Sequence, residues 1–282
     1  MAIKSILVPM TGDGLDRRCL DAAWVAAQPG GAHVTALFGE ISAAEMPVIY
    51  GGDGVGFYLT EEFLQALTER NDAHRATAQA LFNTWTTDRG IGATGSAGGL
   101  VTASFLATPA GDPDSVKRFA LVNDLVVTIL PGQATPDRAD IFESALFSAG
   151  KPVLLVPDQP IVPAAGSSAV ICWNGSAEAA SAVTAALPLL AGAKSVTVLT
   201  ANAGDPAAFI EFLARHGIAA TVTLLSPAMG EVGEALLAEA ERLGAGIIVL
   251  GAYGHSRARE FIFGGVTRHV LHHARTMLFL SH

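Results

Sequence analysis

The strongest constraint on the fold is an internal repeat. Residues 5–13 and residues 168–176 each run from an apolar stretch into a small polar residue, then a glycine, then an Asp or Ser suited to cap a helix. An Ala-rich segment follows in each copy, and three further apolar segments correspond in order. The corresponding segments are 15–27 and 177–190, 32–38 and 194–200, 124–128 and 246–250, and 151–156 and 275–280. The chain is therefore a duplication of one module.

The segment between the copies has the composition of a linker. Residues 158–167 contain two prolines, a glycine and a serine, which suit an exposed connection between folded units. The sequence thus predicts a first domain at 1–157, a linker at 158–167 and a second domain at 168–282.

Short β-branched runs alternate with helical patterns in each copy. In the second copy we expect strands at about 168–173, 195–201, 219–225, 246–251 and 276–281, and helices at about 176–190, 205–216, 229–243 and 265–274. This alternation predicts right-handed crossovers and a parallel sheet covered on both faces, an α/β fold. Such sheets bind ligands at the carboxyl ends of their strands, so we expect a site in the loops after the first, second and fourth strands.

Composition supports a buried sheet and excludes several functions. Of the 282 residues, 50% are hydrophobic and 15% are charged, which excludes a disordered chain. The net charge of −9 and the lack of a Lys/Arg run argue against nucleic acid and anionic lipid as partners. No apolar run reaches 18 residues and the N-terminus lacks signal-peptide features, so we expect a cytoplasmic protein without a membrane partner, with Cys19 and Cys172 reduced.

One loop of the second copy has the features of a phosphate site. Gly251 and Gly254 directly follow the fourth strand, where they let the backbone leave the strand sharply. Nine residues later Gly264 and Gly265 open a helix whose exposed N–H groups and dipole favour an anion, and the Thr267 hydroxyl adds a donor. A strand–turn–helix connection whose glycines only allow close packing explains the same residues, and both readings stay open at this point.

The spacing of this loop resembles the nucleotide-binding signature of the universal stress protein family. Gly-x-x-Gly, nine residues, Gly, a small residue, Val and Ser or Thr occur in that order in the second copy, and the duplication makes the chain similar to tandem two-domain members. The resemblance implies two Rossmann-like, adenine nucleotide alpha hydrolase-like domains, each a five-stranded parallel sheet flanked by helices and often paired through its last strand. It also implies a stress-response or regulatory module that binds ATP or AMP, with Mg²⁺ able to accompany ATP.

The resemblance also assigns the binding residues. By the family pattern, the ligand would be contacted by Asn174, Ala201, Gly251, Tyr253, Gly254, Gly264, Gly265, Val266 and Thr267. Two of these depart from the pattern: Gly265 stands where Ser or Thr is usual, and Asn174 stands where Asp is usual. The first change loses a hydroxyl donor, and the second keeps an acceptor but loses a charge.

The first copy lacks this signature. Ile129 aligns with Gly251, and Asp140 and Glu143 fall near the phosphate-seat positions, where their charges would repel a triphosphate. We therefore expect the first copy to bind no nucleotide and to complete an intramolecular pseudo-dimer, and the resemblance also allows a homodimer.

Several other features point to structure rather than chemistry. The Gly-rich segment at 40–60 neither directly follows a strand nor leads to Lys-Ser or Lys-Thr, so we expect a surface loop that covers a cleft or a subunit interface. His269, His272 and His273 have helical spacing but no Cys or carboxylate beside them, which favours a solvated or stacked face over a metal site. Arg257 and Arg259 are either phosphate ligands or ordinary surface charges.

No catalytic set emerges from the sequence. It contains no Gly-x-Ser-x-Gly elbow, no Gly-x-Gly-x-x-Gly after the first strand of either copy, and no Ser-Gly-Gly-x-Asp-Ser-like loop. A dehydrogenase is therefore disfavoured. Two alternatives to a nucleotide-binding module remain: a structural or signalling stress protein without nucleotide, and a slow ATP hydrolase or adenylating enzyme of the same fold.

Overall fold

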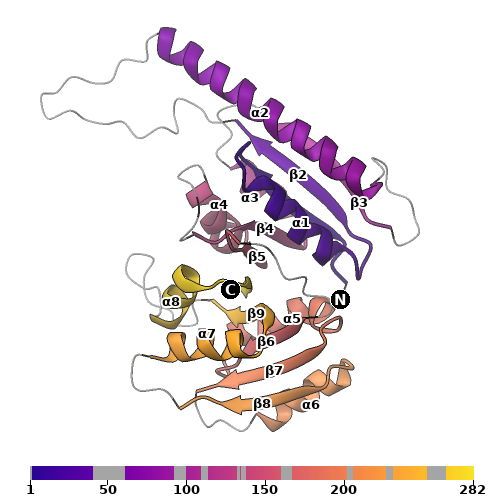
Figure 1. The fold of residues 1–282 in the computed structure, drawn as a ribbon, viewed down its shortest axis with the longest axis vertical. Helices are drawn as coiled ribbons and strands as arrows, with labels where there is room; N and C mark the ends of the chain where they lie inside the picture. Colours follow the sequence, from indigo (N-terminus) through magenta and orange to yellow (C-terminus); the bar gives the residue numbers. More distant parts are fainter. Residues whose placement is uncertain are drawn as a thin grey trace, which may run out of the picture.

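The computed structural model joins both copies in one ten-stranded sheet that has helices on both faces (Figure 1). The structure describes residues 2–40, 61–91, 100–108, 114–131, 134, 138–159, 167–201, 206–226, 231–252 and 265–282. The predicted segment at 41–60, the middle of the predicted linker at 160–166, and Arg257 and Arg259 lie outside these residues.

Strands and helices alternate through the whole chain. The N-terminal copy comprises β1 (Ser5–Met10), α1 (Asp16–Ala27), β2 (His33–Gly39), α2 (Glu61–Arg89), β3 (Thr102–Thr108), α3 (Ser115–Ala120), β4 (Leu125–Ile129), α4 (Ala139–Glu143), the π-helix η4 (Ser144–Ser148) and β5 (Val153–Val156). The C-terminal copy comprises β6 (Ser168–Cys172), α5 (Ala177–Leu190), β7 (Ser195–Thr200), α6 (Ala207–Arg215), β8 (Ala220–Leu224), α7 (Val232–Arg242), β9 (Ala245–Gly251), α8 (Gly265–His273) and β10 (Met277–Ser281). The predicted order of elements in the C-terminal copy is confirmed, with bounds that differ by at most three residues.

The strand order shows where each copy can hold a ligand. It runs β3-β2-β1-β4-β5-β10-β9-β6-β7-β8, so each copy has the same five-strand order and the two copies meet at β5 and β10. All pairs within a copy are parallel, whereas β10 pairs antiparallel with β5, with Phe279 opposite Leu154. The predicted α/β fold class is confirmed. In each copy the order reverses between the first and fourth strands, β1 and β4 or β6 and β9, which is where open α/β sheets bind ligands.

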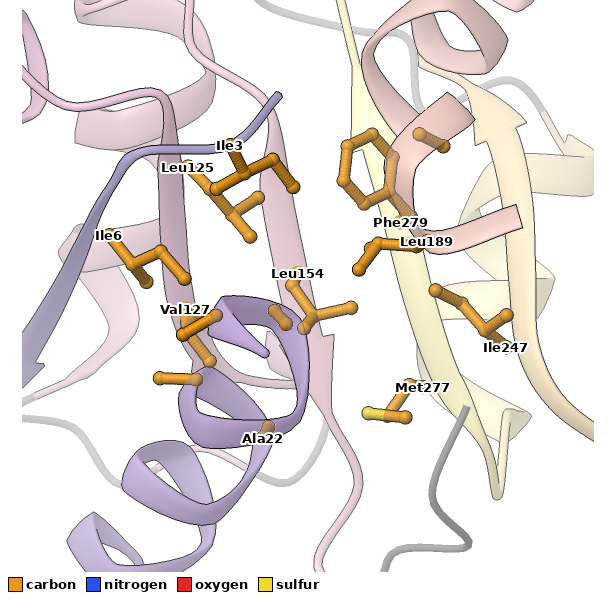
Figure 2. Close-up of a cluster of buried hydrophobic side chains, with 14 of the residues drawn as sticks. Ile3, Ile6, Ala22, Leu125, Val127, Leu154, Leu189, Ile247, Met277 and Phe279 are labelled. Atoms are coloured by element: carbon orange, nitrogen blue, oxygen red, sulfur yellow. The ribbon is translucent and has the colours of Figure 1, made fainter. Parts of the chain in front are cut away.

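The hydrophobic core is continuous across the junction of the copies. On one face of the sheet, Leu154 of β5 and Met277 and Phe279 of β10 belong to a single buried cluster that α1, α2, α5 and α6 cover (Figure 2). On the opposite face, the alternate residues of the same strands belong to a second cluster, with α3, α4, η4, α7 and α8. Alternate strand residues point to opposite faces, so apolar runs such as Val153–Val156 are buried on both sides.

The first helix of each copy begins differently. Ser176 caps α5, since its backbone is extended and its Oγ accepts a hydrogen bond from Ala179 N at 3.1 Å. The matching expectation for Asp13 is wrong. Helix α1 begins at Asp16 with Leu15 as N-cap and no side-chain cap bond, because the Asp13 carboxylate instead binds Leu15 N and Arg138.

Among the helices that the structure describes, none combines the length and the apolar character needed to cross a lipid bilayer.

Candidate functional site

A cavity of about 300 Å³ lies at the reversal of strand order in the C-terminal copy. It is bounded by the carboxyl ends of β6, β7 and β9 and by helices α7 and α8, as expected for a site in the loops after the first, second and fourth strands of this copy. The lining residues are Cys172, Trp173, Asn174, Leu199, Ala201, Leu225, Val232, Leu236, Leu250, Gly251, Val266 and Thr267.

Five of the nine predicted binding residues meet in this cavity. They are Asn174 after β6, Ala201 after β7, Gly251 at the end of β9, and Val266 and Thr267 in the first turn of α8. Gly265 is the first residue of α8 and borders an adjacent open hollow on the helix surface. Tyr253, Gly254 and Gly264 lie outside the described residues, so the structure describes six of the nine predicted positions.

Gly251 is needed for close packing rather than for an unusual backbone angle. Its φ lies outside the left-handed region, so the predicted reason, a backbone angle that other residues resist, is wrong for this glycine. A Cβ at this position would collide with the backbone of Glu178 and Ala179 in the first turn of α5. The absence of a side chain therefore lets the end of β9 lie directly against the N-terminus of α5, beside the cavity that Gly251 lines.

The Asn174 amide is oriented by its own loop. Its Oδ1 accepts a hydrogen bond from Ser176 N at 3.0 Å, a local turn typical of Asn. The next residue, Gly175, has φ +76°, a left-handed conformation that glycine adopts without strain. One of the two lone pairs of the acceptor that the sequence reasoning assigned to Asn174 is thus used within the loop. The NH₂ group can donate to a ligand, a role that an Asp could not fill while ionised.

The cavity walls are apolar and uncharged. None of its described lining residues is Asp, Glu, Lys or Arg, and leucines from β7, β9 and α7 provide much of the surface. Burial raises the pKa of the Cys172 thiol, which keeps this side chain neutral as well. Such walls suit a flat apolar group, and the polar side-chain groups among the described lining residues are those of Asn174 and Thr267, the indole N–H of Trp173 and the Cys172 thiol.

An aromatic pair stands at one side of the cavity. The rings of Trp173 and Phe209 are stacked with centroids 3.8 Å apart and planes within 3°. Phe209 of α6 is buried, while Trp173 is half-buried and lines the cavity. The backbone N–H of Trp173 also donates to Leu199 O at 2.8 Å, so both the backbone and the ring of this residue are held in place.

Helix α8 packs closely against α7. A Cβ at Gly233 of α7 would lie 2.9 Å from the His269 Cβ, so glycine permits this approach. The His269 and His273 rings stack at 4.3 Å, and His273 Nδ1 lies 2.9 Å from the His269 carbonyl. Within the part of the chain that the structure describes, no group of three or more His, Cys, Asp or Glu side chains could hold a metal.

An ion-pair cluster joins the corresponding elements of the N-terminal copy. Arg138, the residue before α4, has a fully buried side chain. Its Nε and Nη2 donate to the two oxygens of Asp13 at 2.8 and 2.6 Å, and Nη2 also donates to Asp16 Oδ1. Asp16 is buried too, and it accepts hydrogen bonds from the backbone of Thr11 and Gly12 at 3.1 and 2.8 Å. The cluster thus joins the loop after β1 to the start of α4, the same two elements that border the cavity in the C-terminal copy.

The charges of this cluster shift its pKa values. For Asp13, burial is outweighed by the hydrogen bonds and charge of Arg138, which lower the pKa to about 2. For Asp16, burial raises the pKa, while Arg138 and the two backbone N–H groups oppose that rise. Burial raises the pKa of the Cys19 thiol to about 12, although Arg138 Nη1 lies 3.9 Å from its Sγ.

The sequence reasoning missed Arg138 and Trp173. It explained the failure of the first copy by Asp140 and Glu143, which the structure places on the exposed surface of α4. The sequence offers only two weak signals for them: Arg138 stands directly before the residues of α4, and an aromatic residue stands directly before Asn174. Neither signal indicates a functional role unless it is known which loops meet in the fold.

Comparison with known proteins agrees with the fold. Residues 217–282 match the model of the Universal stress protein family. The chain is similar in structure to a universal stress protein from Archaeoglobus fulgidus DSM 4304, with 16% identity, 98% of this chain and 95% of that chain covered, and a TM-score of 0.70. It is also similar to a functionally unknown protein from Pseudomonas aeruginosa PAO1, with 17% identity, 99% and 92% covered, and a TM-score of 0.56. No curated protein matches the sequence.

Proposed function

We propose a function from one premise: the resemblance to the universal stress protein family is confirmed, by the family match over residues 217–282 and by a fold shared along the whole chain. On this premise, the C-terminal copy binds an adenine nucleotide, ATP or AMP, and the protein acts as a regulatory stress-response module. The domain division at 1–157, 158–167 and 168–282 is part of the same proposal.

The observation that carries this proposal is the meeting of residues from separate parts of the chain. Asn174, Ala201, Gly251 and Thr267 follow or begin four different elements, yet all line one cavity. Its volume of about 300 Å³ lies at the lower end of the range for small-molecule sites, about 300–1,000 Å³. The cavity therefore accepts a base and part of a ribose, while phosphates extend towards α8.

The start of α8 suits phosphate. Among the described residues, no heavy atom outside the chain neighbours and the backbone of α8 itself lies within 4 Å of the position that a Cβ would take at Gly265, so a ligand can approach the backbone there. The first N–H groups of a helix lack partners within the helix and, with its dipole, attract anions. No described residue that lines the cavity has a carboxylate, so Mg²⁺ that accompanies ATP would be held through the phosphates.

In this proposal the N-terminal copy binds no nucleotide. The Arg138 side chain is committed to Asp13 and Asp16 at the place where phosphates would be held. A phosphate there would have to compete with two carboxylates for the same guanidinium group and would be repelled by both. The N-terminal copy then serves as the partner that completes the sheet through β5.

The test is calorimetric titration of the full chain with ATP and with AMP. We expect one binding event for each chain, and we expect Gly264→Glu to weaken it because the new carboxylate repels phosphate. Gly192→Glu is the matched control, since Gly192 is exposed after α5, at the end of that helix remote from the cavity. Loss of binding in the first variant, with retention in the second, supports the assignment to the C-terminal copy.

The other outcomes distinguish the alternatives. If neither nucleotide gives a heat of binding or shifts the melting temperature, the alternative of a structural or signalling protein without nucleotide is favoured. Release of ADP or pyrophosphate during incubation with Mg-ATP would identify a slow hydrolase or an adenylating enzyme. Two equivalent binding events would contradict the proposal that the N-terminal copy binds no nucleotide.

A further inference from the structure

We propose that Trp173 is the residue that recognises the base, so that the cavity takes the planar aromatic ring of the nucleotide while its phosphates lie at the start of α8. This inference rests on the proposed function and adds a specificity-determining residue to it.

Trp173 stands at the reversal of strand order. It is the first residue after β6, directly before Asn174, and it lines the same cavity as Gly251 and Thr267. Its backbone is fixed by the hydrogen bond to Leu199 O at 2.8 Å. A ligand that lies across the ends of β6 and β9 must therefore pass beside this side chain.

The indole ring is held in one orientation before a ligand arrives. Phe209 lies parallel to it at 3.8 Å, and Phe209 is in turn next to Phe212 at 6.4 Å in the same helix. The stacking on Phe209 fixes the ring without burying it completely, because Trp173 remains half-buried. A fixed aromatic surface binds a flat ring with little loss of side-chain entropy.

The charge of the cavity favours a base over a phosphate beside Trp173. The described lining residues include no Lys or Arg. Four leucines form apolar walls: Leu199, Leu225, Leu236 and Leu250. Placing a phosphate among them would remove its hydration without an ion pair in return. A purine ring, by contrast, gains apolar contact and stacking there, and the Asn174 NH₂ can donate to one of its ring nitrogens.

The experiment compares ATP with inorganic triphosphate on the full chain. We expect Trp173→Leu to weaken ATP binding by about 5- to 150-fold, the range for loss of base–aromatic stacking, and to leave triphosphate binding unchanged. Trp173→Phe should keep most of the affinity, because it preserves an aromatic face. Phe212→Leu is the control, since Phe212 belongs to the same aromatic group but is not among the residues that line the cavity.

Fluorescence gives a second readout that needs no variant to remain stable. The other two tryptophans, Trp24 and Trp85, lie in the N-terminal copy and contact each other there. ATP should quench the emission of the wild type, and triphosphate should not. If Trp173→Leu does not fold, the ATP-dependent quenching and the Trp173→Phe affinity decide the question.

The failures of the two proposals are distinguishable. If the wild type binds neither ATP nor AMP, the proposed function is wrong and the inference falls with it. If the wild type binds ATP but Trp173→Leu binds it equally well, or if ATP leaves the fluorescence unchanged, only the role of Trp173 is wrong. Equal weakening of ATP and triphosphate in Trp173→Leu would also overturn it, because that pattern indicates general damage to the site.

Discussion

Replacement of Arg138 by Met tests whether the cluster in the N-terminal copy holds that copy together. The wild-type guanidinium donates three hydrogen bonds to two carboxylates and has no exposed side-chain surface. Met keeps much of the apolar stem but removes the charge. Asp16, which is itself buried, then loses its counter-ion.

The expected loss is large and depends on pH. Breaking a buried pair by removing one partner costs about 3–5 kcal/mol, because the other charge remains in a low-dielectric environment. Arg138 also opposes the rise of the Asp16 pKa, so its removal should raise that pKa further. Protonation of Asp16 then relieves part of the penalty in the folded state, and the loss should be smaller at pH 5 than at pH 8.

Urea unfolding of the full chain at both pH values measures this effect. Arg242→Met is the control: Arg242 also pairs with a carboxylate, that of Glu239, but its side chain is mostly exposed, so its removal should have little effect. Adding Asp16→Asn to Arg138→Met should recover part of the stability, since it removes the stranded charge. If Arg138→Met is no more damaging than Arg242→Met, or if its cost is the same at both pH values, the cluster does not act as described.

Three further predictions follow from the same structure. The pKa of Asp13 is about 2 in the folded state against 3.8 for an ordinary Asp, so the stability that Asp13 contributes is complete above pH 4 and disappears as the pH falls towards 2. The difference in unfolding free energy between wild type and Asp13→Asn, at most about 2 kcal/mol, should therefore shrink over that range, and a constant difference contradicts the assignment. Leu154→Ala, at the buried pair between β5 and β10, should cost about 2–5 kcal/mol and shift a single calorimetric transition, whereas two independent transitions would show that the shared core does not couple the copies. Gly251→Ala should lower the melting temperature because its Cβ meets the α5 backbone, while Gly265→Ala, where the space is open, should leave it nearly unchanged; equal effects would refute the packing argument.

The strands and helices could be predicted because their signals are local. The apolar runs of β9 and β10 and the Ala-rich pattern of α5 lie within short windows of sequence, and the repeat supplied each pattern twice. The pairing of β5 with β10 could be predicted only through the family resemblance. Nothing in the sequence of Val153–Val156 alone indicates which strand is its antiparallel partner. Apolar strands buried on both faces look alike from the sequence, whatever they pair with.

The site was predictable to the extent that it follows from topology. Asn174 and Gly251 end strands that flank the reversal of strand order, so their proximity follows from the sheet alone. The reason for Gly251 was not predictable, because it depends on contact with Glu178 and Ala179, more than 70 residues earlier in the chain. Arg138 was missed for the same reason: its partners Asp13 and Asp16 are 125 and 122 residues away.

The two copies use the same place in the fold in opposite ways. In the C-terminal copy it is a cavity whose described lining residues carry no charge, and in the N-terminal copy it is a buried cluster of one arginine and two carboxylates. Burial of such a cluster costs desolvation energy that apolar packing would avoid, so stability alone does not explain it. Its evident effect is to tie the loop after β1 to the start of α4 without any ligand.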